Sequence, residues 1–429
     1  MTALAPTVPR RRGACPGLSA PMPTGDGLLV RLQPIGTVPL AAFAALCAAA
    51  RKRGNGVIEV TSRGNIQIRG LTGSSAPRFA AEVAALGIAA DDGVPAYCNA
   101  LAGIGADEVF DAEALAAELR DALAQQSLAA RLSPKVSVAV DGGGTPDLAR
   151  LAADVRLCAQ AVSGEVTLRV AVGGDGNNAI DLGTIDPADG VGAAVRLLEV
   201  VARHGRQRRA RDIVAAEGEA VFRAALAGLL LPGPDAGWNS FGQPKAATQR
   251  DVIGNHPLSD GSVACGVGLA FGHADATIFE RLTDAARDAG VSGFRAAPGR
   301  AFLAVGLPVQ TATAFAAAAA GLGFITQADD PRGRVVACAG APICGSAHIA
   351  SRAIAPLVAA LPEGSVHISG CAKGCAQAGP AALTVVGTAA GCALVANGTT
   401  RDAPFATVSV AELPAAIAAF AKVHEDGHV

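Results

Sequence analysis

Four of the ten cysteines stand in two closely spaced pairs late in the chain. Cys338 and Cys344 form a Cys-x5-Cys pair, Cys371 and Cys375 form a Cys-x3-Cys pair, and 26 residues separate the pairs. Glycines surround both pairs, so their loops can bring thiolates to one point and offer backbone amides to sulfur. Four converging thiolates suit a cubane 4Fe-4S cluster or a structural zinc ion. Zinc sites generally use shorter spacings within each pair, which favours the cluster.

The other cysteines have no such spacing. A lone cysteine is ordinarily a small buried hydrophobic side chain, which is the role expected of Cys47, Cys158, Cys265 and Cys392. Cys15 and Cys98 are left without a role. Disulfides would need an oxidising compartment, and the start of the chain has basic residues but no apolar signal segment. We therefore expect a cytoplasmic protein.

Strands and turns must position the paired cysteines. An apolar strand is expected at 334–337, directly before Cys338, and another at 365–368, before Cys371. An alanine-rich helix is expected over 346–361, beginning near Cys344. The cysteines therefore occupy loops at the ends of these elements.

A pattern of strand, helix and two strands occurs twice, 236 residues apart. In the first copy the strands are expected at 28–32, 57–60 and 66–68, and the helix at 40–53. Nine of 36 aligned residues are identical, and several are glycines at the ends of elements. The recurring residues are Gly36, Phe43, Leu46, Ala49, Ala50, Arg51, Gly54, Gly70 and Leu71, which return as Gly272, Phe279, Leu282, Ala285, Ala286, Arg287, Gly290, Gly306 and Leu307. We interpret this as an internal duplication.

The segments that follow each copy also correspond. Residues 134–144 resemble 364–375, each a strand that enters a glycine-rich loop, and each is followed by strands and an alanine-rich helix, at 191–203 and 410–423. Only the second loop carries cysteines, so one half is expected to do chemistry and the other to act as a scaffold. The glycine strings at 142–144 and 173–178 are expected to be hairpin turns, since neither has the form of a dinucleotide-binding loop.

Length and composition restrict the class of protein. The 429 residues are enough for two or three domains, and 51% are hydrophobic and 17% charged, which excludes a disordered chain. Long apolar stretches such as 313–322 are too short to span a bilayer. The net charge of −2 gives no global basic field for nucleic acid.

Taken together, these segments resemble the nitrite/sulfite reductase superfamily and, within it, the family of precorrin-3B synthases of aerobic cobalamin synthesis. The cysteine region is the most specific part, with ACAGAPICGSA at 337–347 and HISGCAKGCAQ at 367–377. RRGACPGL at 11–18, GDGLLVRL at 25–32 and EVTSRGNIQIRG at 59–70 add to it. The resemblance covers nearly the whole chain.

The resemblance implies an internally duplicated α+β fold, in which two ferredoxin-like half-domains form one shared domain and two larger α+β domains flank a central cleft. The expected divisions are an extended lead-in at 1–26, the half-domains at 27–75 and 245–310, a first α+β domain without a cluster at 76–235, and a second α+β domain with the cluster at 311–429. The stretch 212–245 is expected to cross between the halves.

The resemblance also implies a monooxygenase. Precorrin-3A, an anionic tetrapyrrole, would be hydroxylated with dioxygen and closed to a γ-lactone, while a separate NADH-dependent donor passes electrons to the 4Fe-4S cluster on Cys338, Cys344, Cys371 and Cys375. Family members also carry a mononuclear non-haem iron. The sequence shows no ligand spacing for it among the seven histidines, which are His204, His256, His273, His348, His367, His424 and His428.

A nitrite or sulfite reductase with sirohaem and a 4Fe-4S cluster is the alternative, with Cys375 bridging cluster and haem iron. Sirohaem members place an Arg-Asn pair where 94–99 has no arginine, and two lysines where only Lys135 remains. They also usually carry a Pro-Asn insert between the last two cysteines, where this chain has 372–374. These departures favour the corrin enzyme. A non-catalytic protein with a structural metal is a third hypothesis.

A tetrapyrrole with eight carboxylates requires several cations, and arginine binds carboxylate through two nitrogens. Arg63 and Arg69 flank a strand of the first copy, and Arg295 and Arg300 occupy the matching element of the second. At the offset of 236, Arg300 aligns with Gly64 rather than with Arg63, which is a slip of one residue. All four are expected to bind substrate, unless they are surface ion pairs.

Two lysines and an arginine run are further candidates. Lys135 and Lys373 lie on the corresponding glycine loops of the two copies and are also expected to bind substrate. The run of arginines over 203–211 is ordinarily a solvated helix face. Its functional interpretation is a carboxylate clamp or a docking face for an acidic electron donor.

Overall fold

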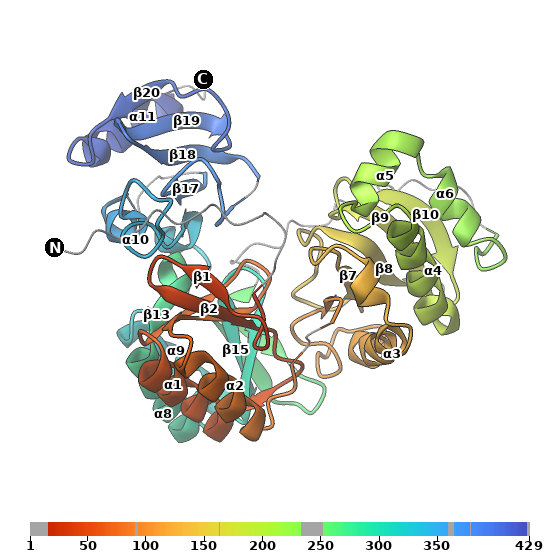
Figure 1. Ribbon diagram of the computed structural model, residues 1–429. Coiled ribbons are helices and arrows are strands. Elements are labelled where there is room, and N and C mark those ends of the chain that lie inside the picture. Colours follow the sequence, from red (N-terminus) through yellow and green to blue (C-terminus); the bar gives the residue numbers. More distant parts are fainter. Residues whose placement is uncertain are drawn as a thin grey trace.

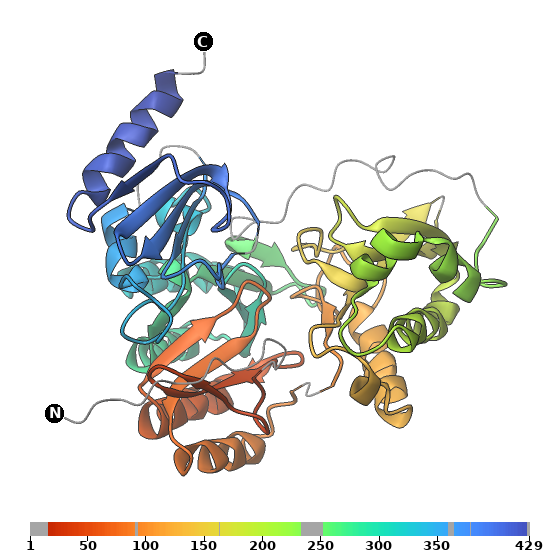
Figure 2. The same ribbon diagram turned by 45° about the horizontal axis from the view of Figure 1, so that its top comes forward.

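The computed structural model describes residues 16–90, 93–162, 164–232, 252–358, 364–377 and 379–426. These residues form a mixed α+β fold with four five-stranded sheets. Two sheets lie together in a shared core, and one sheet lies in each of two flanking units (Figure 1). The flanking units are the cysteine-bearing one at the C-terminal end and the one drawn in yellow and green (Figure 2).

The two core sheets are antiparallel. The first has the order β1 (Met22–Thr24), β2 (Gly27–Leu32), β5 (Ile66–Leu71), β4 (Val57–Val60) and β13 (His273–Asp275). The second has the order β11 (Gly254–Pro257), β12 (Val263–Gly268), β15 (Ala301–Leu307), β14 (Gly293–Ala297) and β3 (Val38–Pro39). Each sheet therefore takes its last strand from the other half of the chain, since β13 pairs with β4 and β3 with β14.

Four helices pack on these sheets. They are α1 (Leu40–Arg53), α2 (Ser75–Ala85), α8 (Ala276–Ala289) and α9 (Ala312–Gly321). A single hydrophobic core spans both halves. The ring of Phe43 lies 5.8 Å from that of Phe279 and 4.9 Å from that of Phe294. None of the helices in the described ranges has both the length and the apolar character needed to span a bilayer.

The internal duplication is confirmed element by element. An offset of 236 carries the helix at 40–53 onto 276–289 and the strand at 27–32 onto 263–268, without a shift at either end. Two of the recurring glycines, Gly70 and Gly306, lie near the ends of strands β5 and β15, and Gly290 caps the second helix in the left-handed conformation (φ 84°).

The flanking sheets repeat one topology. The first has β6 (Ala96–Cys98), β7 (Val138–Asp141), β8 (Ala153–Val162), β9 (Glu165–Gly174) and β10 (Ile180–Ile185), and the second has β16 (Val335–Ala337), β17 (Val366–Ser369), β18 (Ala381–Thr388), β19 (Gly391–Gly398) and β20 (Ala406–Val408). In both, the first two pairings are parallel and the last two antiparallel.

Helices complete each unit. The first has α3 (Ala112–Gln125), α4 (Gly190–Arg203), α5 (Ala210–Glu217) and α6 (Ala220–Ala225), and the second has α10 (Ser351–Ile354) and α11 (Leu413–Asp426). Short 3₁₀ turns occur at Leu128–Arg131, Pro187–Asp189, Ala270–Gly272, Val309–Thr311, Pro331–Arg334 and Ala355–Val358.

Three expectations require correction. The prediction of one helix over 346–361 was wrong, because the described part of this segment forms only α10 and a 3₁₀ turn. The His348 amide donates to the Gly370 carbonyl of the neighbouring loop, at 2.7 Å, and so does not take part in a helix. Residues 359–363 lie outside the described ranges.

Gly142–Gly144 is not a hairpin turn, because β7 and β8 run parallel. The hairpin at 173–178 is confirmed. Residues expected in the crossing at 212–245 lie partly in α5 and α6, and 233–251 are not described.

Candidate functional site

The paired cysteines follow two neighbouring parallel strands. Cys338 comes directly after β16, and Cys371 comes two residues after β17. The parallel register pairs Ala337 with Ile368, so both strands end at the same edge of the sheet. Cys344 and Cys375 lie further along the same two loops. This topology delivers all four thiols to one side of the second flanking unit.

The four thiols influence one another electrostatically. The pKa of Cys375 is raised, first by burial and then by the nearby thiols of Cys371, Cys338 and Cys344. Three of the four side chains are half-buried, and Cys375 is exposed. The amide of Gly370 donates to Cys338 Sγ at 3.1 Å, and the hydroxyl of Ser351 lies 3.5 Å from the same sulfur. Such donors stabilise negative charge on a thiolate.

Two glycines allow the cysteine loops to meet. A Cβ at Gly370 would lie 2.6 Å from Ala347 Cβ, and one at Gly340, where φ is 68°, would lie 2.3 Å from the Ser351 amide. Four thiols are the donor set that 4Fe-4S clusters use, and one of them, Cys338, accepts a hydrogen bond from a backbone amide. Within the described ranges, no group of three or more His, Cys, Asp or Glu side chains is arranged to ligate a single metal ion.

The remaining described cysteines have a different environment. Burial raises the pKa of Cys98 and Cys158 to about 12 and of Cys265 to about 11, and it also raises the pKa of Cys47 and Cys392. Unlike the shift at Cys375, none of these shifts has a neighbouring thiol among its causes. Cys15 lies outside the described residues.

Two predicted cations lie at the cysteine loops. Arg300 donates to the Ala376 carbonyl at 2.6 Å, one residue after Cys375. Its φ is 66°, an uncommon value for a residue with a side chain, and burial lowers its pKa to about 10. Lys373 donates to Ser346 Oγ at 2.9 Å and is exposed. Arg300 therefore connects the core to the second flanking unit, and Lys373 connects the two cysteine loops of that unit.

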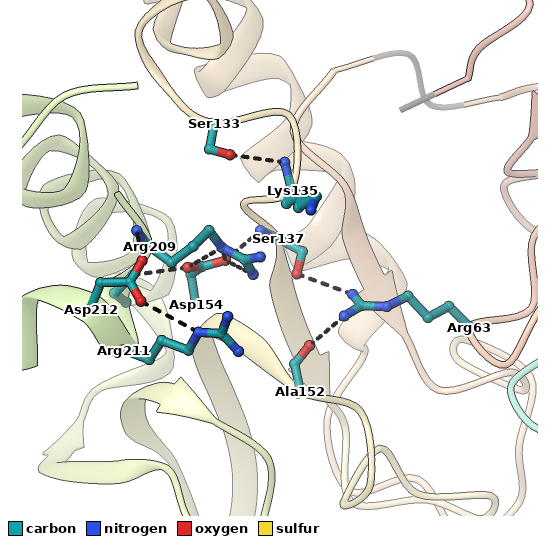
Figure 3. A network of polar contacts seen from close by, with 10 residues as sticks. Arg63, Ser133, Lys135, Ser137, Ala152, Asp154, Arg209, Arg211 and Asp212 are labelled. Atoms are coloured by element: carbon teal, nitrogen blue, oxygen red, sulfur yellow. Dashed lines mark hydrogen bonds and ion pairs between the residues drawn. The ribbon is translucent and has the colours of Figure 1, made fainter. Parts of the chain in front are cut away.

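Arg63 and Lys135 lie at the other flanking unit. Arg63 extends from the core and donates to Ser137 Oγ at 3.4 Å and to the Ala152 carbonyl at 3.1 Å (Figure 3). Its guanidinium carbon lies 5.6 Å from the centroid of the Tyr97 ring. Lys135 is exposed, two residues before Ser137. Arg63 therefore ties the core to the first flanking unit.

The one-residue slip between Arg63 and Arg300 falls in two turns that touch each other. The Gly299 amide donates to the Ser62 carbonyl at 3.0 Å, and a Cβ at Gly64 would lie 2.9 Å from the carbonyl carbon of Ala297. Because neither arginine is inside a strand, the slip does not reverse a side chain from one sheet face to the other.

Arg69 and Arg295 are engaged inside the core. Arg69 lies 2.6 Å from Glu59 Oε1 and 3.6 Å from Asp26 Oδ1. Arg295 is 8% exposed and donates to Thr37 Oγ1 (2.8 Å) and to the Ala102 carbonyl (2.7 Å). The structure therefore brings Arg300 and Lys373 to the cysteine loops, whereas these two arginines hold neighbouring backbone and carboxylates.

The arginine run divides into structural and exposed members. Arg209 forms an ion pair with the buried Asp154 at 2.6 Å, and Asp154 also accepts from the Ser137 amide at 3.0 Å (Figure 3). Arg211 lies 3.6 Å from Asp212, and this ion pair is separate from the buried pair of Arg209 and Asp154. The exposed members are Arg203, Arg206, Arg208 and Arg211.

The five histidines whose side chains the structure describes do not form a shared site. His204, His256 and His273 each bond a backbone carbonyl, and His348 is exposed. His367 on β17 is fully buried, and neither ring nitrogen has a hydrogen-bond partner in the described structure. Burial, and then the charge of Arg300, lowers its pKa to about 4. The side chains of His424 and His428 are not described.

Two features of the structure were not predicted from the sequence. Glu59, beyond its bond to Arg69, also forms an ion pair with Arg352 of α10, 293 residues away. No sequence signal indicates such a distant pair. From the sequence, Asn99 was mentioned only because no arginine precedes it. Aligning β6 with β16 would have identified Asn99 as the counterpart of Cys338.

In the first flanking unit, Asn99 occupies the position that Cys338 has in the second, directly after the first strand of the sheet. Its Oδ1 accepts from the Gly142 amide at 2.7 Å, as Cys338 Sγ accepts from that of Gly370. Its Nδ2 donates to Asp141 and to the carbonyls of Gly144 and Pro146, at 3.0 to 3.1 Å. In the first unit, the side chain of Asn99 therefore holds this loop through hydrogen bonds, whereas the corresponding loop of the second unit carries cysteines.

Three comparisons relate this chain to known proteins. Residues 20–86 match the nitrite/sulfite reductase ferredoxin-like half domain. A precorrin-3B synthase from Sinorhizobium sp. is 38% identical over 403 residues, which covers 92% of this chain and 85% of the relative. The structure of the Mycobacterium tuberculosis NirA protein has a TM-score of 0.73 at 20% identity and covers 90% of this chain and 79% of that chain, a likeness of fold.

Proposed function

The chain belongs to the precorrin-3B synthase family, within the nitrite/sulfite reductase-like superfamily, and from this premise we propose that it is an oxidoreductase of cobalamin biosynthesis. The proposed reaction is the dioxygen-dependent hydroxylation of precorrin-3A, followed by closure of a γ-lactone from a ring acetate. One oxygen atom enters the product, and the other leaves as water with two electrons from a separate NADH-dependent donor. The 38% identity to a precorrin-3B synthase over 92% of this chain is the observation that carries the proposal, and two cysteine loops that leave the same sheet edge support it.

Cys338, Cys344, Cys371 and Cys375 would hold a 4Fe-4S cluster, which supplies single-electron transfer when bound. The chain prepares this site with the Gly370 amide directed at Cys338 Sγ. Arg300 fixes the end of the second cysteine loop through the Ala376 carbonyl. Both contacts would restrict the positions of the sulfurs.

The substrate would lie between two pairs of cations, each made of one core arginine and one lysine of a flanking unit. Arg63 and Lys135 belong to one side, and Arg300 and Lys373 to the other. Each is proposed to meet a carboxylate of the tetrapyrrole and so orient the ring. Arg69 and Arg295 are proposed to support binding by holding the segments beside these side chains.

A mononuclear iron would supply oxygen activation. The resemblance to the family supports its presence, but the described residues gather no ligand set for it. No residue of this chain is therefore assigned to that iron.

The test compares Cys371→Ser with a matched change, Cys392→Ala, in a buried cysteine of the same unit. Both proteins are purified without oxygen and analysed for iron, sulfide and visible absorption. We expect Cys371→Ser to lose cluster iron, sulfide and tetrapyrrole hydroxylation together, while Cys392→Ala keeps all three.

Two outcomes would contradict this assignment. Hydroxylation that persists in Cys371→Ser without cluster iron would remove the cluster from the reaction. Absorption bands of sirohaem in the unaltered protein would instead support the alternative nitrite or sulfite reductase.

A further inference from the structure

Ser351 brings a buried hydroxyl to one of the four paired thiols. Its side chain is fully buried at the start of α10, and its Oγ lies 3.5 Å from Cys338 Sγ. The same sulfur accepts a hydrogen bond from the Gly370 amide at 3.1 Å. Among the described residues, the hydrogen bonds that reach a sulfur of these two loops all end on Cys338. The surroundings of Cys338 therefore differ from those of the other three thiols.

The backbone around Ser351 holds its hydroxyl in this place. The His348 amide, three residues earlier, donates to the Gly370 carbonyl at 2.7 Å, so the segment that enters α10 is bonded to the neighbouring cysteine loop. A Cβ at Gly370 would lie 3.3 Å from Ser351 Oγ, and one at Gly340 would lie 3.0 Å from Ser351 Cβ. Glycine at these two positions therefore lets the hydroxyl approach the sulfur.

The direction of this hydrogen bond depends on the state of the sulfur. A thiol and a hydroxyl can each donate, so either atom can be the donor while Cys338 is protonated. A thiolate that binds iron has no hydrogen to give, which leaves Ser351 as the donor. Within the described part of the chain, Cys338 Sγ is the one partner that Ser351 Oγ reaches. A buried hydroxyl without a partner is unfavourable, so this hydroxyl should stay directed at the sulfur.

We propose that Ser351 is a positioning residue that donates to Cys338 Sγ in the iron-loaded protein and thereby raises the reduction potential of the cluster. This inference rests on the proposed function, because it requires a 4Fe-4S cluster on the four cysteines. One electron from the separate donor adds one negative charge to the cluster. A hydrogen bond to a ligand sulfur stabilises this more negative, reduced form. No covalent bond of Ser351 forms or breaks in the step.

The test measures the midpoint potential of the cluster in Ser351→Ala. The complete proteins are purified without oxygen, analysed for iron and sulfide, and titrated with dithionite while electron paramagnetic resonance follows the reduced cluster. We expect the ratio of reduced to oxidised cluster at a given potential to fall about tenfold, which is a midpoint potential lower by about 59 mV for one electron.

Two matched variants separate the hydrogen bond to sulfur from the loss of any buried hydroxyl. Ser351→Thr keeps the hydroxyl and should stay close to the potential of the unaltered protein. Thr384→Val removes a fully buried hydroxyl of β18 that donates to the Gly398 carbonyl at 2.7 Å instead of to a sulfur. It should leave the potential unchanged.

Resonance Raman spectroscopy adds a measurement that a merely structural role of Ser351 would not affect. Exchange into deuterium oxide should shift the iron–sulfur stretching bands of the unaltered protein, because deuterium then occupies the hydrogen bonds to Cys338 Sγ. This shift should be smaller in Ser351→Ala, which keeps only the Gly370 amide as a donor.

Three results would overturn the proposal. These are an unchanged potential in iron-loaded Ser351→Ala, an equal fall in Thr384→Val, and bands of the unaltered protein that do not move on exchange. Absence of iron and sulfide from the unaltered protein would instead refute the cluster itself, and with it this inference.

Discussion

Two arginines in adjoining turns connect the core to opposite flanking units. Arg63 reaches Ser137 and Ala152 of the first unit, and Arg300 reaches Ala376 of the second. The duplication thus keeps a similar side chain for each unit, although the two are not at equivalent positions. If the substrate binds between the two flanking units, both arginines extend from the core toward the units that it would contact.

His367 is a second feature at the scale of the residue. Its pKa is about 4 in the folded protein, against an ordinary value of 6.5. Between these values the unfolded chain binds a proton that the native protein does not. Stability should therefore fall as the pH falls from about 6.5 toward about 4.

We predict that unaltered protein loses about 2 kcal/mol more unfolding free energy than His367→Gln between pH 7 and pH 5. Urea unfolding at the two pH values measures this difference. His348→Gln, at an exposed histidine, should behave like the unaltered protein. An identical pH dependence in His367→Gln would contradict a buried neutral His367.

Residue roles were only partly predictable from the sequence. The spacing of the cysteines was sufficient to single out four of ten. The environments of Arg69 and Arg295 were not predictable, because their partners, Glu59, Thr37 and Ala102, lie on other elements. An arginine beside a strand has the same sequence signature whether it faces a ligand or a buried carboxylate.

At the scale of elements, Glu59 on β4 joins the core to α10 of the second flanking unit. It pairs with both Arg69 and Arg352, and all three side chains are mostly buried. Removing Glu59 leaves Arg352 without its carboxylate and Arg69 with Asp26 alone, at 3.6 Å, and breaking a buried pair costs about 3–5 kcal/mol. Removing Arg352 leaves Glu59 with Arg69.

We therefore predict that Glu59→Leu lowers the unfolding free energy by about 3–5 kcal/mol, and that Arg352→Met costs clearly less. Denaturant unfolding of the two variants measures the order. Arg51→Met serves as a control, because its ion pair with Glu280 is largely exposed. Equal losses in the two core variants would mean that Arg69 does not compensate Glu59.

The elements differed in how well the sequence indicated them. The helix at 40–53 and its repeat have a regular apolar pattern, and their bounds could be read directly. The helix expected over 346–361 rested on alanine content alone, while the structure uses that backbone to bond the neighbouring loop. Strands as short as Val38–Pro39 have no periodic pattern, so the exchange of edge strands could not be predicted.

At the scale of the whole molecule, the exchanged strands and the aromatic core make the halves interdependent. Phe43 of the first half packs against Phe279, Phe294 and Phe302 of the second. Either half alone would expose this surface and an unpaired sheet edge.

We predict that fragments 1–232 and 252–429 are insoluble or unfolded when expressed separately, and that they copurify when expressed together. A tag on one fragment, followed by size-exclusion chromatography, measures the association. Phe43→Asp should abolish copurification, since it places a charge in the shared core. Cooperative melting of either fragment alone would contradict the interdependence.

In the reaction that we propose, this chain hydroxylates a tetrapyrrole with oxygen taken from dioxygen. The most direct measurement supplies the cluster-loaded protein with precorrin-3A, a reductant and isotopically labelled dioxygen, and then determines the product mass. We predict a product that gains one labelled oxygen atom, and none in Cys371→Ser. A product without labelled oxygen, or reduction of nitrite or sulfite by the protein in place of this reaction, would contradict the account.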